Sequence, residues 1–258
     1  MLLNKIFDLL KIDNRSPYFL TIDLGSETIK VLLNEVIIEE NEEKVRVKGV
    51  YKEYLSSEIN FYGQIIDVEK LKHALSKILD QIKKEFKNLA IKDVLVTLSG
   101  NNSRSIMTTL QIDRPVSSVI SEKESIEISQ KVFEAAYKEL SQIIYEETGE
   151  ENVELELLDY IPVYQTCDGR EVIDLIGEEG NEIQVCYSVF FGKSSIIGDY
   201  KKLIKSLGLN LVSFIPSNLA VLKSLKSSKK DKIDCVILDI GGYNTEAIIC
   251  FGGGVFLN

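Results

Sequence analysis

The sequence predicts a mixed α/β protein, and three observations carry this prediction. Residues 18–55 show strand periodicity in three consecutive segments, residues 63–87 switch to helical periodicity, and a second series of strand-like segments begins near residue 235. Apolar residues that alternate with polar ones indicate half-buried strands, whereas an apolar face repeating every 3.6 residues indicates an amphipathic helix. The succession of both patterns along one chain is typical of α/β folds.

The composition is that of a folded globular protein. Of 258 residues, 45% are hydrophobic and 27% are charged, with only 4 prolines, which excludes collagen-like, mucin-like and wholly disordered chains. No apolar run approaches the roughly 18 residues that a membrane span needs. The formal net charge of −10 argues against a nucleic-acid partner, because nucleic acids are polyanions.

Cysteine and histidine usage narrows the chemistry further. The 4 cysteines lack a CxxC spacing and there is 1 histidine, so a zinc site or a histidine-based catalytic triad is not expected. The start of the chain carries no small-residue cleavage site of a signal peptide. These features together predict a cytoplasmic protein.

The first residues predict an N-terminal amphipathic tail over residues 1–17. At helical period, the apolar positions fall on one face: Leu2, Leu3, Ile6, Phe7, Leu9 and Leu10. The polar positions fall opposite: Asn4, Lys5, Asp8 and Lys11. Two interpretations stay open, a short helix that binds a membrane or a partner, and a terminal helix that packs on its own domain or frays.

The next segments predict a meander followed by a helix. Residues 18–55 read as three antiparallel strands, because the connections at Gly25 and at residues 41–43 are short. The helix over residues 63–87 has Asp67 as its expected N-cap. His73 lies beside the apolar face of this helix, and we interpret it as a surface or hydrogen-bonded residue rather than a catalyst.

Residues 93–192 predict an inserted strand–helix–strand–strand unit. A strand over residues 93–100 ends in a Ser-Gly turn, extended chain continues over 101–113, and Pro115 is expected to stop it. The serines around 99–105 are interpreted as part of a structural turn, since a catalytic serine needs a nearby base.

The helix of this insertion and the elements after it have clear boundaries. Ser121 and Glu124 form an S-x-x-E capping box, which predicts a helix from there to about Glu147. A short helix over residues 196–207 is closed by Gly208. A strand and a further helix follow, and a second meander then begins.

An internal repeat connects the two meanders. At a constant spacing of 216 residues, a strand end and a turn recur: Asp23, Leu24, Gly25 and Ser26 match Asp239, Ile240, Gly241 and Gly242. Each aspartate ends an apolar strand, and each glycine turn leads directly into a second strand. The two copies predict two related halves that face one another.

The chemistry of these turns points to the phosphates of a nucleotide. A glycine turn lets backbone N–H groups approach a polyanion closely. Ser26 and Thr28 can add hydroxyl donors, and Lys30 can reach a phosphate oxygen. Asp23 and Asp239 would repel phosphate, so we expect them to hold Mg²⁺ through water. Two opposed turns would then clamp the phosphates between the halves.

These motifs resemble the phosphate loops of the actin/Hsp70/sugar-kinase ATPase superfamily. DLGSETIK (23–30) looks like the first loop and DIGGYNTE (239–246) like the second. Within the superfamily the chain is similar to the FtsA family of bacterial cell-division proteins. The supporting segments are YGQIIDVEKL (62–71), VLVTLSGNNSRSI (94–106) and ISEKE (120–124).

The resemblance implies an actin-like ATPase (ribonuclease H-like) α/β fold with an inserted SHS2 (1C) subdomain and an incomplete second large domain. It implies subdomain 1A over residues 18–92 and 193–231, the insertion over 93–192, and the start of subdomain 2A over 232–258.

By the same resemblance, the protein would bind ATP and Mg²⁺ with at most slow ATPase activity, and no catalytic residue is assigned. The first phosphate loop would comprise Asp23, Gly25, Ser26, Thr28 and Lys30. The second would comprise Asp239, Gly241, Gly242 and Thr245. One departure is Tyr243, which stands where the usual pattern has a third glycine and would narrow the approach of the backbone to the phosphates.

The resemblance further implies self-association into filaments, binding of an FtsZ-like protein and other divisome proteins, and a peripheral position at the inner face of the cell membrane. Three alternatives stay open: a PilM-like scaffold of type IV pilus assembly, a small-molecule kinase of the same superfamily, and a structural module without a working site. The last meander is expected to have two unpaired edges and an exposed apolar face, which favour association.

Overall fold

The computed structural model describes residues 16–40, 42–55, 60–61, 64–65, 67–100, 102–226, 232–242 and 245–257. The chain separates into two compact units. Unit 1 consists of Met1–Asn102, Ser194–Ser217 and Ile240–Thr245, and unit 2 of Ser103–Lys193, Asn218–Asp239 and Glu246–Asn258. The predicted tail over 1–17 lies outside the described residues except for Ser16 and Pro17, and so does Tyr243.

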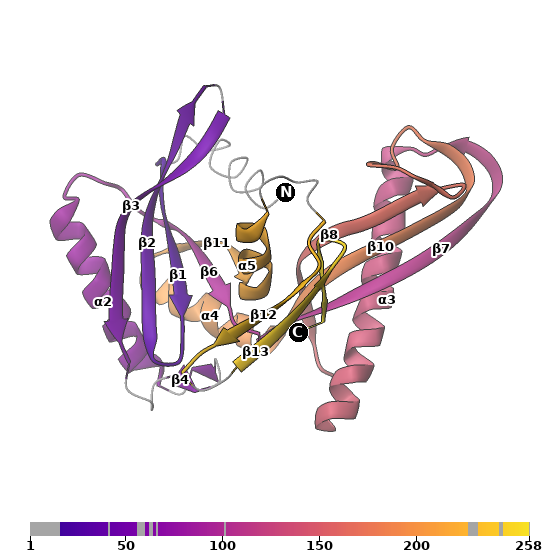
Figure 1. Cartoon of the computed structure of the whole chain (residues 1–258). Coiled ribbons are helices and arrows are strands. Elements are labelled where there is room, and N and C mark those ends of the chain that lie inside the picture. The colour runs from indigo at the N-terminus through magenta and orange to yellow at the C-terminus, as the bar shows by residue number, and fades with distance from the viewer. Residues whose placement is uncertain are drawn as a thin grey trace. The chain divides into compact units, whose positions relative to one another are not determined.

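Unit 1 is built on a five-stranded sheet with the order β11-β6-β1-β2-β3 (Figure 1). The first three strands, β1 (Tyr18–Leu24), β2 (Thr28–Glu39) and β3 (Glu42–Tyr54), are antiparallel neighbours, which confirms the predicted meander. Strand β6 (Asp93–Leu98) runs parallel to β1, and β11 (Asn210–Pro216) runs parallel to β6.

Two helices of unit 1 begin or end at predicted residues. Helix α2 (Val68–Glu85) has Asp67 as its N-cap, whose side chain accepts a hydrogen bond from the Lys70 backbone N–H at 2.9 Å. This bond lowers the pKa of Asp67, because it stabilises the charged carboxylate. Helix α4 (Ser194–Ser206) is followed by Gly208 at φ 72°, the left-handed conformation that glycine adopts without strain. A short hairpin of β4 (Asn60–Phe61) and β5 (Gln64–Ile65) precedes α2.

Unit 2 contains the predicted strand–helix–strand–strand unit. Its long strands are β7 (Ser103–Val119), β8 (Leu155–Cys167) and β10 (Glu179–Lys193), with β10 antiparallel between the other two. Strand β9 (Arg170–Glu171) pairs with β8. Helix α3 (Glu122–Thr148) starts at the expected cap, where the Ser121 hydroxyl accepts from the Glu124 N–H at 3.2 Å. Its apolar face forms a core with these strands: Ile128, Val132, Ala136, Leu140 and Ile144.

The prediction that Pro115 stops the strand was wrong, since β7 continues to Val119. Proline cannot donate a backbone hydrogen bond, so it is tolerated in a sheet where the ladder is interrupted. The register between β7 and β10 shifts between Gly180 and Glu182, opposite this stretch. Arg114 secures the irregular segment by donating to the Gly180 and Ser118 carbonyls at 2.6 and 2.7 Å.

The last meander consists of β12 (Cys235–Ile240), β13 (Thr245–Phe251) and β14 (Gly254–Leu257). The prediction of two unpaired edges was wrong, because β14 pairs with β7 through Leu257 and Ile106. Helix α5 (Ser217–Leu225) contributes to a core on the inner face of the meander: Phe190, Leu219, Leu222, Ile248, Cys250 and Val255.

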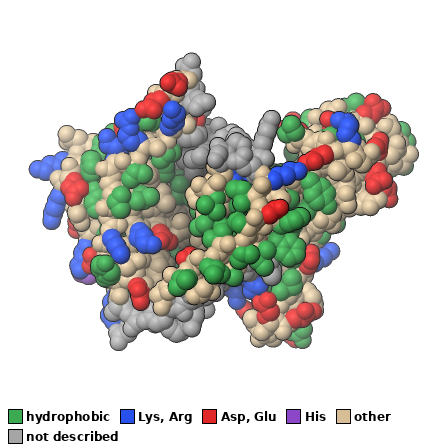
Figure 2. Space-filling view, in the orientation of Figure 1, with side chains coloured by type: hydrophobic (Ala, Val, Ile, Leu, Met, Phe, Trp, Pro, Cys, Tyr) green, Lys and Arg blue, Asp and Glu red, His purple; other side chains and the backbone are tan. Residues whose placement is uncertain are grey.

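The outer face of this meander is apolar and exposed, as expected (Figure 2). Its exposed side chains are Val236, Leu238, Ile240, Ile249, Phe251 and Phe256. Among the helices of the described residues, none has the length and hydropathy needed to span a membrane.

Candidate functional site

The first candidate residue, Asp23, lies near the end of β1, next to the parallel strand β6. The carboxyl ends of parallel strands meet at one edge of a sheet, where ligands commonly bind. The Thr97 hydroxyl donates to Asp23 Oδ1 at 2.7 Å, and Lys30 Nζ lies 3.4 Å from Asp23 Oδ2. The Asp23 side chain is 42% exposed, so its carboxylate remains accessible to a hydrated cation.

Lys30 lies directly opposite Asp23 in the antiparallel register of β1 and β2. Its ammonium group forms an ion pair with Asp23 and is 57% exposed. Exposed ion pairs of this kind contribute at most about 1 kcal/mol. A phosphate group could therefore redirect Lys30 at small cost.

The turn between β1 and β2 is closed by its own backbone. The Gly25 N–H donates to the Thr28 carbonyl at 3.0 Å, and a Cβ at Gly25 would lie 3.0 Å from that same oxygen. Glycine is therefore required for the tightness of this turn. Since the Gly25 N–H is used within the turn, phosphate contacts would fall to Ser26 and to the Thr28 hydroxyl.

The second turn meets the first turn within unit 1. A Cβ at Gly242 would lie 2.5 Å from Cδ of Glu27, so the Gly242 backbone packs directly against that side chain. Glu27 also accepts a hydrogen bond from the Leu55 N–H through its backbone carbonyl at 2.7 Å. A carboxylate therefore lies between the two turns, where sequence reasoning expected only phosphate-binding groups.

The remaining predicted residues of the second copy are exposed. Asp239 lies near the end of β12 in unit 2, and Gly241 and Thr245 lie in the segment that belongs to unit 1. Among the described residues, no group of three or more His, Cys, Asp or Glu side chains could hold a metal directly. A magnesium ion held through water by single carboxylates needs no such cluster.

Two neighbours of Asp23 were missed from the sequence. Thr97 lies in the apolar strand β6 and has no local feature that marks it, but the parallel pairing of Ile22 with Val96 brings it beside Asp23. Tyr200 of α4 is buried, and burial, together with the Asp23 charge, raises its pKa. Its hydroxyl therefore stays neutral.

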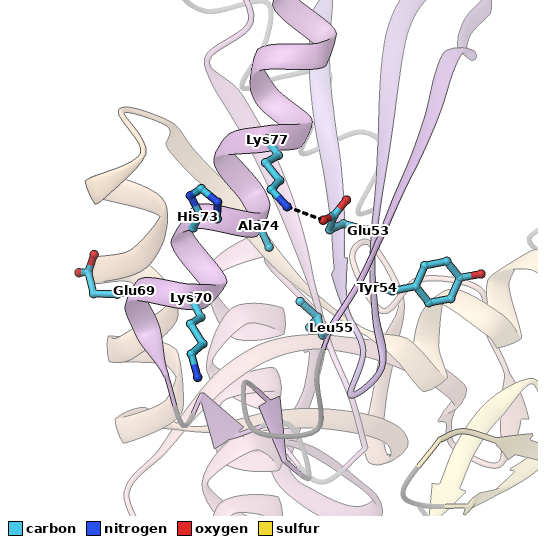
Figure 3. Close-up of a pocket in the computed structure, with 8 residues that line it drawn as sticks. All are labelled: Glu53, Tyr54, Leu55, Glu69, Lys70, His73, Ala74 and Lys77. Atoms are coloured by element: carbon cyan, nitrogen blue, oxygen red, sulfur yellow. Dashed lines mark hydrogen bonds and ion pairs between the residues drawn. The ribbon is translucent and has the colours of Figure 1, made fainter.

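A separate groove of about 390 Å³ lies between the end of β3 and the first half of α2 (Figure 3). Leu55 and Ala74 line it, and Lys77 reaches across it to Glu53 at 3.1 Å. His73 is exposed at this groove, in agreement with its interpretation as a surface histidine. The sequence did not predict this groove.

Comparison with known proteins agrees with this architecture. No protein-family model matches the chain. The cell division protein FtsA of Streptococcus pneumoniae is 24% identical over 237 residues, which cover 91% of this chain and 48% of that protein. FtsA of Enterococcus hirae is 23% identical over 237 residues, covering 91% and 49%. The chain thus spans about half the length of the curated relatives it matches.

Among solved structures, the PilM-PilN type IV pilus biogenesis complex has a chain that aligns with a TM-score of 0.56 at 15% identity. The alignment covers 92% of this chain and 59% of that chain. The fold is that of the actin-like ATPases. The similarity to FtsA in sequence confirms the resemblance seen in the motifs.

Proposed function

We propose that the two turns of the repeat bind the phosphates of ATP together with Mg²⁺. The observation that carries this proposal is the contact between Gly242 and Glu27, which makes the two turns neighbours in unit 1. Asp23 is accessible at the sheet edge beside them. Nucleotide binding is also what the actin-like ATPase fold implies in general.

Each residue of the first turn has a distinct role in this proposal. Asp23 holds the hydration shell of the cation, and the Thr97 hydroxyl fixes the orientation of its carboxylate. Lys30 leaves Asp23 and pairs with a phosphate oxygen, and the Ser26 and Thr28 hydroxyls donate to others. The cation, when bound, neutralises part of the phosphate charge.

For the whole protein we propose an FtsA-like adaptor in bacterial cell division. It would self-associate into filaments, bind an FtsZ-like protein and other divisome proteins, and work at the inner face of the cell membrane without spanning it. The support is the similarity over nine-tenths of this chain to FtsA of Streptococcus pneumoniae. Polymerisation and partner binding are proposed for the protein as a whole, since the similarity covers about half of that relative.

A PilM-like scaffold of type IV pilus assembly is the second candidate. The observation that favours it is the backbone similarity to a chain of the PilM-PilN complex. A pull-down with two immobilised peptides separates the candidates. Retention on an FtsZ tail peptide supports the divisome adaptor, whereas retention on the N-terminal peptide of a pilus-assembly partner supports the scaffold.

Calorimetric titration with Mg-ATP tests the site. Asp23→Ala and Lys30→Ala should each weaken binding by about 1–3 kcal/mol, the range for hydrogen bonds to charged groups. Lys52→Ala is the matched control, because Lys52 is exposed on β3 directly opposite Lys30 but lies outside the turn. Equal affinities for the wild type and both turn variants would remove Asp23 and Lys30 from the site.

A further inference from the structure

Strands β2 and β3 extend beyond the rest of the sheet as a two-stranded arm (Figure 1). Strand β1 pairs with β2 from Leu24 to Tyr18, opposite Glu35, whereas β2 and β3 continue to pair as far as Glu39 and Glu42. Residues directly opposite each other in antiparallel strands share a face. The register therefore assigns each arm residue to one of two faces.

The first face of the arm is charged. Glu39 pairs with Arg46 at 2.8 Å and with Lys44 at 3.6 Å, and Glu35 pairs with Lys48 at 3.5 Å. These side chains are solvated and neutralise one another. This side of the arm suits contact with water.

The second face, which we call the arm face, is apolar. It comprises Leu32, Val36, Ile38, Val45, Val47 and Val50. Ile38 is 74% exposed, Val50 71% and Val47 51%, and Figure 2 shows hydrophobic side chains gathered over β2 and β3. Contiguous exposed apolar surface of this kind usually marks an interaction site.

Helix α2 does not cover the arm face. The Tyr51 hydroxyl donates to Glu85 of α2 at 2.6 Å, and Tyr51 follows Val50 in an extended strand, so their side chains point to opposite faces. Helix α2 therefore packs on the far side of the sheet from Val50.

We propose that residues 1–12 of the same chain cover the arm face as an amphipathic helix. Their sequence carries an apolar stripe more than 100° wide, the width typical of a helix that packs on a core. A helix of this length is marginal in water by itself. It needs an apolar surface to fold upon, and the arm face provides one.

The attachment point of this segment favours the arm face. The Val36 N–H donates to the Pro17 carbonyl at 2.8 Å, so the chain enters the sheet beside Val36, in the middle of the arm face. Residues 12–16 can span up to about 17 Å when extended. A helix over residues 2–11 would be about 15 Å long, comparable with the distance of about 13 Å from Val36 to Leu32 along β2.

The charge of the segment argues against a membrane as its main binding surface. Residues 1–12 contain Lys5 and Lys11 but also Asp8. Segments that bind anionic lipid usually have 4–8 basic residues. Attachment next to the arm face also makes the contact intramolecular, which raises its effective concentration.

A single introduced tryptophan tests this proposal, because the chain contains no tryptophan of its own. The full chain with Phe7→Trp should emit at shorter wavelength than a synthetic peptide of residues 1–15 with the same substitution. The shift should not depend on protein concentration. Adding Val47→Lys and Val50→Lys should return the emission to that of the peptide.

The matched control is Val116→Lys with Val119→Lys, two exposed valines of β7 in unit 2, which should leave the emission unchanged. Circular dichroism checks folding, and Ile38→Lys at the tip of the arm provides a second test variant. Emission equal to that of the peptide, or a shift that both arm variants leave intact, would overturn the proposal. So would a shift that appears only at high protein concentration, which indicates a second copy, or only with phosphatidylglycerol vesicles.

Discussion

The two copies of the repeat differ in the burial of the strand that leads into each turn. Three apolar residues precede or follow the aspartate at corresponding positions. In the first copy they are buried at 1%, 0% and 4% exposure: Leu20, Ile22 and Leu24. In the second copy they are 64%, 63% and 77% exposed: Val236, Leu238 and Ile240. The local sequences are alike, so the neighbouring elements cause the difference.

Those neighbours are visible in the sheet order. Strand β1 lies between β2 and β6, whereas β12 lies at the end of its sheet. The pairing within each copy is nevertheless alike. Phe19 lies opposite Asn34 in the first copy, and at the equivalent positions the Cys235 and Cys250 side chains are hydrogen-bonded. Local sequence thus determines the turn and the register, and the surrounding elements determine burial.

The largest effect expected from this comparison is on stability. Ile22→Ala should lower the free energy of unfolding by about 2–5 kcal/mol, because it leaves a cavity in a packed core. Leu238→Ala, at the equivalent exposed position, should change it by less than about 0.5 kcal/mol. Urea unfolding followed by circular dichroism measures both values. Equal losses would show that the second copy is as well packed as the first.

Local signals predicted most elements of the fold, and long-range pairing accounts for the errors. The caps at Asp67 and Ser121 and the turn at Gly208 follow from side-chain chemistry within a few residues. The continuation of β7 past Pro115 depends on an irregularity in its partner β10. The pairing of β14 with β7 joins segments about 150 residues apart (Leu257 and Ile106), which no local pattern encodes.

The next effect concerns the buried inner face of the second copy. Burial, and then the neighbouring Cys235 thiol, raise the pKa of Cys250 from 9.0 to about 11. Only the thiolate reacts, so alkylation of Cys250 at pH 8 should be about a hundredfold slower than that of an unperturbed thiol. Its rate should rise about tenfold per pH unit up to about pH 11. Iodoacetamide labelling with peptide mass mapping measures this rate.

Cys235→Ser provides the control for this labelling experiment. It removes the neighbouring thiol and its hydrogen bond but leaves Cys250 buried, so the pKa should fall only in part. A pH profile centred near 9 in the unmodified protein would contradict the buried inner face.

The exposed outer face should drive self-association. Leu238→Lys should raise the dissociation constant of any oligomer by at least about tenfold, since burying one leucine contributes about 1.5–3 kcal/mol. Ile173→Lys is the control, because Ile173 is 90% exposed but lies outside the meander. Light scattering over a concentration series gives the masses. Identical masses for both variants would exclude the outer face from association.

The candidate site was predictable where it depends on adjacent residues. Asp23 and Gly25 lie at a strand end and in a tight turn, as their order in the sequence indicates. Thr97 was missed because its contact with Asp23 depends on the parallel pairing of β1 with β6, some 70 residues later. Glu27 was missed because the sequence does not show that the second turn packs against it.

The smallest expected effect concerns that Glu27 carboxylate between the two turns. Its charge repels the phosphates that the proposed site binds, so Glu27→Gln should tighten Mg-ATP binding, by about 0.5–1 kcal/mol for an exposed charge. Added salt should reduce the gain, because it screens exposed charges. Glu39→Gln, an exposed glutamate at the arm tip, should have no effect. Weaker binding of the Glu27 variant would instead assign its carboxylate to the cation, and both turns would then supply acidic groups to the metal rather than one repelling the phosphates.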